Sequence, residues 1–304
     1  MNYRHHFHAG NFADVMKHAL LLQLVRALQK KPKGFLGLDT HAGRGTYDLE
    51  AAQTGDSLAR QPEWPAGIGL LWTTDSANPP AVLPEPLADY VALVRDFDRR
   101  MGNVGAGPRF YPGSPAILQA TARPADRLAL FEKHPAECAA LRAEFGGRAG
   151  IAIQEGDGYA ALRACLPPPE RRALVLIDPP FEAQDEFAQI AAALREGLRR
   201  MPGGVFAVWY PLTQRARADE FLAAVRALNP PPALACELTI AGAGSALKMK
   251  GCGLLVINPP WQFEPGARAT LEALAALLAQ EPGGGAWLDW IVRETVGREP
   301  RLSS

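Results

Sequence analysis

The stretch "ALVLIDPPFE" (173–182) decides how the rest of this chain is interpreted. It is an apolar, partly β-branched run that ends in an acidic side chain, two prolines and an aromatic residue. A short apolar run bounded by turn residues is typical of a buried strand, and the prolines end it because they cannot donate to a ladder. A second stretch, "GLLVINPPWQ" (253–262), repeats the pattern with asparagine in place of aspartate. One active site needs only one such strand end, so the surroundings must distinguish the two copies.

The strand at 173–178 belongs to a series of strands that alternate with helices. Further strands are predicted at 35–39, 128–132, 150–158 and 204–211. Helical patterns occupy 136–145, 158–166, 185–200 and 214–228. This alternation predicts an α/β fold with a mainly parallel sheet and helices on both of its faces.

The two ends of the chain extend this core. Residues 11–30 predict a helix with Asn11 as its N-cap and Asp14 in its first turn, where an acidic side chain suits the helix dipole. Near the other end, 236–242 and 251–260 predict an antiparallel hairpin that would complete a seven-stranded sheet. The alternating run 286–292 has the pattern of an edge strand.

We expect a single domain over residues 1–304, with an N-terminal segment and helix over 1–34. The interval between Asp39 and Leu128 is too long for a simple βα unit, and much of it is rich in proline. We therefore expect an inserted helical subdomain over 52–106. Two interpretations of it stay open: it packs over the edge of the sheet, or it grips a substrate.

Composition limits the classes of partner. The 304 residues carry a formal net charge of zero, so any nucleic acid has to be held by local basic patches. The four cysteines are far apart and form no C-x-x-C pair, which predicts reduced thiols in a cytoplasmic protein without disulfides or a zinc site. No apolar run approaches the ~20 residues that cross a bilayer, so no membrane partner is expected.

Ligands of a doubly wound sheet bind at the carboxyl ends of its strands. In chain order those ends carry Asp39 with the loop His41-Ala-Gly43-Arg-Gly45, then Glu132, then Asp157-Gly158, then Asp178. This order suits S-adenosylmethionine: the glycine loop approaches the methionine half, Glu132 accepts from the ribose hydroxyls, and Asp157 accepts from the adenine amine beside Gly158. A nicotinamide-binding fold remains an alternative, although only Gly43 and Gly45 match its glycine pattern.

The residues 178–181 fit the chemistry of a nucleobase amine. Such an amine is a poor nucleophile, because its lone pair is delocalised into the ring. The Asp178 carboxylate and the Pro179 carbonyl can accept its two hydrogens and align the lone pair with a methyl donor. Phe181 can stack the base, an interaction of about 1–3 kcal/mol. The alternative is a strand ended by a Pro-Pro turn, with Phe181 in the core. Asn258 could serve the same chemistry, but its strand is expected on the far side of the sheet, so Asn258 is the secondary candidate.

Six segments together resemble the RlmJ family of bacterial methyltransferases, which act on N6 of an adenine in 23S ribosomal RNA. They are "YRHHFHAGNFADVMKH" (3–18), "LDTHAGRG" (38–45), "FYPGSP" (110–115), "LFEKHP" (130–135), "EGDG" (155–158) and "IDPPF" (177–181). The resemblance implies a Rossmann-like class I methyltransferase fold with a small helical insertion. It also implies S-adenosylmethionine as cofactor and a monomer that acts on largely protein-free 23S rRNA.

The resemblance also implies roles for individual residues. Cofactor contacts are expected from Lys17, His18, His41, Gly43, Ser114, Glu132, Asp157, Gly158 and Asp178. Asp178 is the expected catalytic residue, and Phe181 stands where the family commonly has tyrosine. Ser114 followed by Pro115 is typical of an N-cap and first helical residue, so we expect Ser114 to cap a helix whose free backbone donors face the cofactor.

The first residues of the chain are candidates for RNA contact. Tyr3, Arg4, His5, His6 and His8 combine aromatic and cationic groups that can stack on bases and bind phosphate. A solvated tail is the competing interpretation, and no spacing of carboxylates or cysteines completes a metal site. The basic clusters 30–33, 215–217 and 248–250 are either further phosphate contacts or ordinary surface.

Function classes other than adenine methylation in rRNA stay open at this point. The same four-residue motif also serves enzymes that methylate DNA adenine or the N2 amine of guanine in rRNA. From another class, an NAD-dependent oxidoreductase and a non-catalytic RNA-binding module both fit parts of the pattern.

Overall fold

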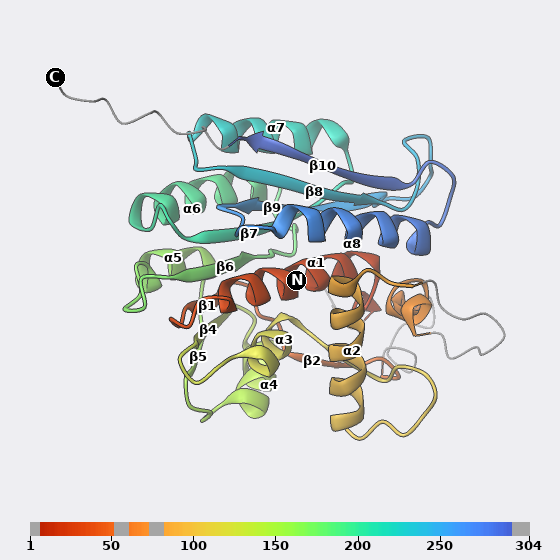
Figure 1. The fold of residues 1–304 in the computed structure, drawn as a ribbon, viewed down its shortest axis with the longest axis horizontal. Helices are drawn as coiled ribbons and strands as arrows, with labels where there is room; N and C mark the ends of the chain where they lie inside the picture. Colours follow the sequence, from red (N-terminus) through yellow and green to blue (C-terminus); the bar gives the residue numbers. More distant parts are fainter. Residues whose placement is uncertain (1–6, 52–60, 73–81, 294–304) are drawn as a thin grey trace.

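The computed structural model describes residues 7–51, 61–72 and 82–293. Five parallel strands form one side of its large sheet. Leu38 lies in the middle of them and pairs with both Ala129 and Val175. In chain order these strands are β1 (Leu36–Asp39), β4 (Arg127–Glu132), β5 (Ile151–Glu155), β6 (Ala173–Ile177) and β7 (Val205–Pro211). The predicted α/β fold with a mainly parallel sheet is confirmed (Figure 1).

Three further strands extend the sheet on the β7 side. They are β8 (Ala233–Thr239), β9 (Gly251–Ile257) and β10 (Gly285–Val292), and the order across the sheet is β10-β8-β9-β7-β6-β1-β4-β5. The predicted hairpin of β8 and β9 is confirmed, with β9 antiparallel to both β7 and β8. The expected number of seven strands is wrong by one, because the alternating run at the end pairs with β8 as an eighth, edge strand.

Helices cover both faces of the sheet (Figure 1). One core contains side chains of α1 (Phe12–Gln29), α2 (Glu85–Arg100), α3 (Ser114–Thr121), α4 (Pro135–Phe145) and α8 (Phe263–Leu278). The core on the other face contains side chains of α5 (Gly158–Cys165), α6 (Glu186–Arg200) and α7 (Arg215–Ala227). Within the described ranges, no helix is long and apolar enough to cross a membrane.

Helix α1 lies in the middle of the first core. It contacts α8, α2 and α3 as well as strand β9, so 14 of its 18 residues are buried. Asn11 caps it as predicted, and its side chain accepts hydrogen bonds from the backbone of Ala13 and Asp14. Polar side chains on the buried part of a helix need partners inside the protein. This requirement explains the contacts of Asp14, Lys17 and His18 described below.

The inserted segment is anchored by a second, two-stranded sheet. Strands β2 (Thr46–Asp48) and β3 (Phe110–Pro112) pair antiparallel on either side of it. Its described part holds two short 3-10 helices, η2 (Trp64–Ala66) and η3 (Ile68–Leu71), and α2, whose apolar face packs into the first core. Residues of the 61–66 stretch face the cavity described next. The segment therefore packs through α2 on helices α1 and α8, which cover the sheet, and it also reaches the cavity.

Candidate active site

The carboxyl edge of the sheet holds a cavity of about 1300 Å³. Every predicted site residue in the described ranges lines it: His8, Lys17, His18, His41, Gly43, Ser114, Glu132, Asp157, Gly158, Asp178, Pro179 and Phe181. Tyr3, Arg4, His5 and His6 lie outside the described residues. The structure thus brings together residues that are far apart in sequence, as expected for loops that follow neighbouring parallel strands.

Lys17 connects α1 to the end of β6. Its Nζ donates to Asp14 Oδ1 at 2.8 Å and to Asp178 Oδ2 at 2.5 Å. Burial lowers the pKa of Lys17, but the two carboxylates outweigh it and hold the pKa well above its ordinary value. The lysine is therefore a fixed cation that positions Asp178, whose side chain is 16% exposed toward the cavity.

The last residue of β1 and the loop after it carry two groups with shifted pKa values. Burial raises the pKa of Asp39 to about 7, against smaller lowering effects from the Ser114 side chain and the His41 backbone. Asp39 Oδ2 is buried without a hydrogen-bond partner among the described residues. Burial also lowers the pKa of His41 to about 4, so its ring is neutral at pH 7, with Nδ1 2.8 Å from Thr40 Oγ1. Strongly shifted groups beside a cavity are typical of functional sites.

Two further carboxylates hold the backbone around the cavity. Glu132 accepts from Gly43 N at 2.8 Å and from His134 N at 2.7 Å, and Gly43 has φ 60°. Asp157 is the N-cap of α5 and accepts from Tyr159 N at 3.1 Å. Each carboxylate keeps acceptor capacity for a ligand beyond these bonds.

Gly158 lies in close contact with another loop. A Cβ on this residue would lie 1.9 Å from the carbonyl oxygen of Thr40, so the start of α5 packs directly against the loop after β1. Only a residue without a side chain allows this close contact between two backbone segments.

Helix α3 and its neighbours form the wall below α1. The expected N-cap role of Ser114 is wrong by one residue: Gly113 is the N-cap and Ser114 the first helical residue, without a side-chain capping bond. Behind Ser114, His18 Nδ1 lies 2.8 Å from Tyr111 Oη, which lies 2.8 Å from Tyr90 Oη. This buried chain fixes the His18 ring at the cavity wall.

The loop after β6 carries the aromatic group. Phe181 adopts φ 51°, which is uncommon for a bulky residue, and such strain is typical of functional sites. Its ring packs edge-on against Phe187 at 5.0 Å and against Trp209 at 5.6 Å between centroids. Phe181, Pro179 and Trp209 all line the cavity.

Sequence reasoning missed part of the site. Asp14 was expected only to suit the helix dipole, yet it holds Lys17, and the three-residue spacing of the two on a helix was the available signal. Trp209 and Glu186 also line the cavity, and Glu186 accepts from the Tyr159 hydroxyl at 2.5 Å. Nothing in their local sequence marks them. No group of His, Cys, Asp and Glu side chains that could hold a metal ion occurs in the described part of the chain.

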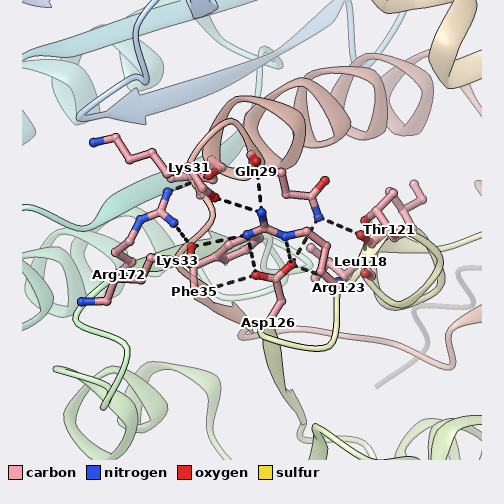
Figure 2. A network of polar contacts seen from close by, with 11 residues as sticks. Gln29, Lys31, Lys33, Phe35, Leu118, Thr121, Arg123, Asp126 and Arg172 are labelled. Carbon is pink, nitrogen blue, oxygen red and sulfur yellow. Dashed lines mark hydrogen bonds and ion pairs between the residues drawn. The ribbon is translucent and has the colours of Figure 1, made fainter.

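The opposite edge of the sheet has a structural role (Figure 2). Asp126 accepts from the Arg123 side chain and from the backbone of Phe35, and Arg123 also donates to the carbonyls of Gln29 and Lys31. The Arg172 guanidinium donates to the carbonyls of Leu28 and Lys33. These contacts fix the loop over 30–34, so the basic cluster 30–33 lies away from the cavity.

Asn258 lies at this opposite edge as well. Strand β9 runs antiparallel to β7, so its end at Ile257 pairs with Phe206 at the start of β7. The Asn258 amide donates to the carbonyls of Pro202 at 2.7 Å and Gly204 at 2.8 Å. The interpretation of 258–260 as a strand end on the far side from the cofactor loop agrees with this placement.

A parallel sheet that continues into a reversed hairpin, with acidic strand ends around one cavity, defines a class I methyltransferase. The chain belongs to the family described as "Ribosomal RNA large subunit methyltransferase D, RlmJ", whose model matches residues 32–292. It is 36% identical over 294 residues to ribosomal RNA large subunit methyltransferase J of Escherichia coli, covering 97% of this chain and 100% of that protein. It is 37% identical over 298 residues to the protein of that name from Haemophilus influenzae, with the same coverage.

A solved structure supports the fold. The crystal structure of protein LPL1258 from Legionella pneumophila superposes with a TM-score of 0.80 at 32% identity. The match covers 93% of this chain and 98% of that one. The expected class I methyltransferase fold and the resemblance to the RlmJ family are confirmed.

Proposed function

We propose that this protein transfers the methyl group of S-adenosylmethionine to the N6 amine of an adenine in 23S rRNA. The observation that carries the proposal is the position of Asp178: its carboxylate lies at the end of β6 on the cavity wall, between the cofactor loops and the aromatic group of Phe181. The names of the two bacterial relatives support ribosomal RNA as the substrate. The family resemblance further implies a monomer in the cytoplasm that acts on largely protein-free RNA.

The cavity fits a cationic cofactor. Its acidic side chains outnumber its lysines: they are Asp14, Glu63, Glu132, Glu137, Asp157, Asp178, Glu182 and Glu186, against Lys17, Lys133 and Lys248. An acidic wall favours a sulfonium and disfavours a pyrophosphate, so this balance supports S-adenosylmethionine over a dinucleotide. Glu132, Asp157 and His41 would hold the nucleoside part and Lys17, His18 and Ser114 the methionine part. When bound, the cofactor supplies an electrophilic methyl group.

Residues of this chain would orient the target amine and accept its hydrogens. Lys17 occupies Asp178 Oδ2, and no described protein group bonds to Oδ1, which is therefore available to accept one amine hydrogen. The Pro179 carbonyl accepts the other, because proline leaves its carbonyl fixed and outside any helix. Two such acceptors localise the amine lone pair and point it along the line of attack. Asp178 then takes the proton that the methylated amine releases, directly or through water.

The decisive test is mass spectrometry of nucleosides after reaction of the protein with S-adenosylmethionine. Three substrates separate the candidates: protein-free 23S rRNA, the same RNA already packed in ribosomal particles, and duplex DNA. We expect N6-methyladenosine from the protein-free RNA. Methylated DNA adenine alone, or a guanine N2 product, would overturn the proposal. Calorimetry should show binding of S-adenosylmethionine, and binding of NAD in its place would favour an oxidoreductase.

A further inference from the structure

The loop between β8 and β9 borders the cavity beside the proposed target base. Strand β9 begins where β7 ends, since Cys252 pairs with Pro211, so this loop lies at the same edge of the sheet as Asp178. Its residues Leu247, Lys248 and Met249 line the cavity. In the sheet order, β9 and β7 lie on one side of β6, and the cofactor strands β1, β4 and β5 lie on the other. The loop therefore belongs to the substrate half of the cavity.

The charge of the cavity makes Lys248 unusual. An RNA strand that delivers a base to this acidic wall brings a negative phosphate with every nucleotide, and the phosphate needs a cation nearby. Lys17 is held by two aspartates, and Lys133 directly follows Glu132 in the cofactor half. Lys248 is exposed, and none of the described contacts gives its ammonium group a partner. Of the cavity lysines, it is the one free to meet phosphate on the substrate side.

The loop itself is held in place by its own bonds. Lys250, two residues further on, donates from Nζ to the carbonyl of Ala243 at 2.8 Å. The backbone N–H of Leu247 donates to Ser245 Oγ at 3.0 Å, and the backbone of Ile240 bonds to that of Lys250 at 2.8 Å. One lysine of the pair thus supports the loop, and the other is presented at the rim of the cavity.

We propose that Lys248 binds a phosphate of the RNA strand next to the target nucleotide, with Leu247 and Met249 packing against the neighbouring base or sugar. This inference rests on the proposed function, and it selects one of the two readings of the basic cluster 248–250. Phosphate contacts set the position of a nucleic acid and do not read its sequence. Lys248 is therefore a positioning residue for the RNA, and it acts on binding of the substrate and not on the methyl transfer step.

The test compares Lys248→Glu and Lys248→Ala with Lys31→Glu, a matched change of charge on an exposed lysine at the opposite edge of the sheet. We expect the KM for 23S rRNA to rise about tenfold in Lys248→Ala, the size of one charge-assisted hydrogen bond, and further in Lys248→Glu. The slope of log affinity against log salt should fall by about 0.7, the value for one phosphate on a single strand. The kcat at saturating RNA, the affinity for S-adenosylmethionine and the melting temperature should stay at wild-type values.

The outcomes separate the inference from the function on which it rests. If the wild-type protein methylates no RNA, the proposed function fails before any variant is examined. If the wild type is active and Lys248→Glu keeps its KM and salt slope, the inference is wrong. An equal rise in KM for Lys31→Glu would also overturn it, since the effect would then come from net charge. So would a loss of cofactor affinity in Lys248→Ala, because the loop would then belong to the cofactor half.

Discussion

The segments 177–181 and 257–261 share an isoleucine, a short polar residue, two prolines and an aromatic, yet they lie at opposite edges of one sheet. The first follows β6, which runs parallel to its neighbours, and so it ends at the cavity. The second follows β9, which runs antiparallel to β7, and so it ends where β7 begins. The direction of the strand, and not the motif, determines which of the two can meet a ligand.

The two segments also use their polar residue differently. Asp178 is bonded to Lys17 through one oxygen and faces the cavity, whereas both hydrogens of the Asn258 amide are taken by the carbonyls of Pro202 and Gly204. The Trp261 ring is 84% exposed and lines no part of the cavity. At one edge of the sheet a carboxylate oxygen stays available for a substrate. At the other edge the polar side chain forms hydrogen bonds within the protein.

The largest difference between the two segments should appear when the polar residue of each is replaced by alanine. We expect Asp178→Ala to lower the kcat for methyl transfer by roughly 10²–10⁴-fold, since it removes an acceptor of the amine and its proton. Asn258→Ala should leave the kcat unchanged and cost about 1–3 kcal/mol of the free energy of unfolding, because two hydrogen bonds to the carbonyls of Pro202 and Gly204 are lost. Single-turnover kinetics and urea denaturation of both variants test this pair.

Cofactor affinity is the control for the first variant. Lys17 keeps Asp14 as a partner in Asp178→Ala, so calorimetry with S-adenosylmethionine should still show binding. Normal methylation by Asp178→Ala together with a collapse of activity in Asn258→Ala would reverse the assignment of the two edges.

Two buried aspartates extend the comparison to pH. At the cavity edge, Asp39 is fully buried, one of its oxygens has no partner in the part of the chain that the structure describes, and burial raises its pKa to about 7. At the other edge the Asp126 side chain is 1% exposed. Figure 2 shows it in contact with Arg123. Burial raises its pKa, but bonds from Arg123 and Gln29 outweigh this and hold the pKa below its ordinary value. The two carboxylates should therefore contribute to stability with opposite dependence on pH.

The sign follows from proton binding in the folded and unfolded states. An unfolded aspartate titrates near pH ~3.9. Folded Asp39 keeps its proton up to about pH 7, so the wild type should lose about 2–3 kcal/mol relative to Asp39→Asn between pH 5 and 8, at about 1.4 kcal/mol per pH unit. Asp126 contributes above the unfolded pKa and loses its contribution as the pH falls through its folded value. The cost of Asp126→Asn, about 2–3 kcal/mol, should thus be constant from pH 5 to 8 and shrink below pH ~4.

Denaturation with urea at pH 3, 5 and 8 measures both differences against the wild type. A difference between wild type and Asp39→Asn that does not change from pH 5 to 8 would show that Asp39 is already ionised at pH 5. Both buried aspartates would then be ionised in the folded protein. The two edges of the sheet would differ only in their two proline segments.

The sequence predicted those features that depend on local pattern. Apolar runs and turn residues placed the strands of the large sheet and the helices, with bounds that differ by a few residues at most. The order of acidic strand ends, from Asp39 to Asp178, correctly placed the site residues around one cavity, because adjacent loops of a parallel sheet must meet there. The expected position of its strand on the far side of the sheet also set Asn258 apart from the site, and the structure adds that this strand runs in the opposite direction.

Local sequence patterns do not indicate features that depend on contacts between residues far apart in the chain. The bond from Lys17 to Asp178 spans 161 residues, so no local pattern indicates that one positions the other. Strands β2 and β3 have three residues each, too few for an alternation to be seen. The backbone contact that excludes a side chain at Gly158 comes from Thr40 on another loop. Sequence pattern gives the elements and their order, while packing decides which polar atoms meet.

The smallest expected effect concerns the aromatic residue of each segment. Phe181 packs on Phe187 and Trp209 and lines the cavity, so Phe181→Ala should remove a stacking surface worth about 1–3 kcal/mol, seen as a fall of roughly 5–150-fold in kcat/KM for RNA. Phe181→Tyr should restore activity, since the flat ring is what the base needs. Trp261→Ala is the matched control, because its exposed ring touches no part of the cavity, and it should leave kcat/KM unchanged. Equal losses in Phe181→Ala and Trp261→Ala would mean that RNA reaches both edges of the sheet, and the distinction drawn from strand direction would then hold for the cofactor but not for the substrate.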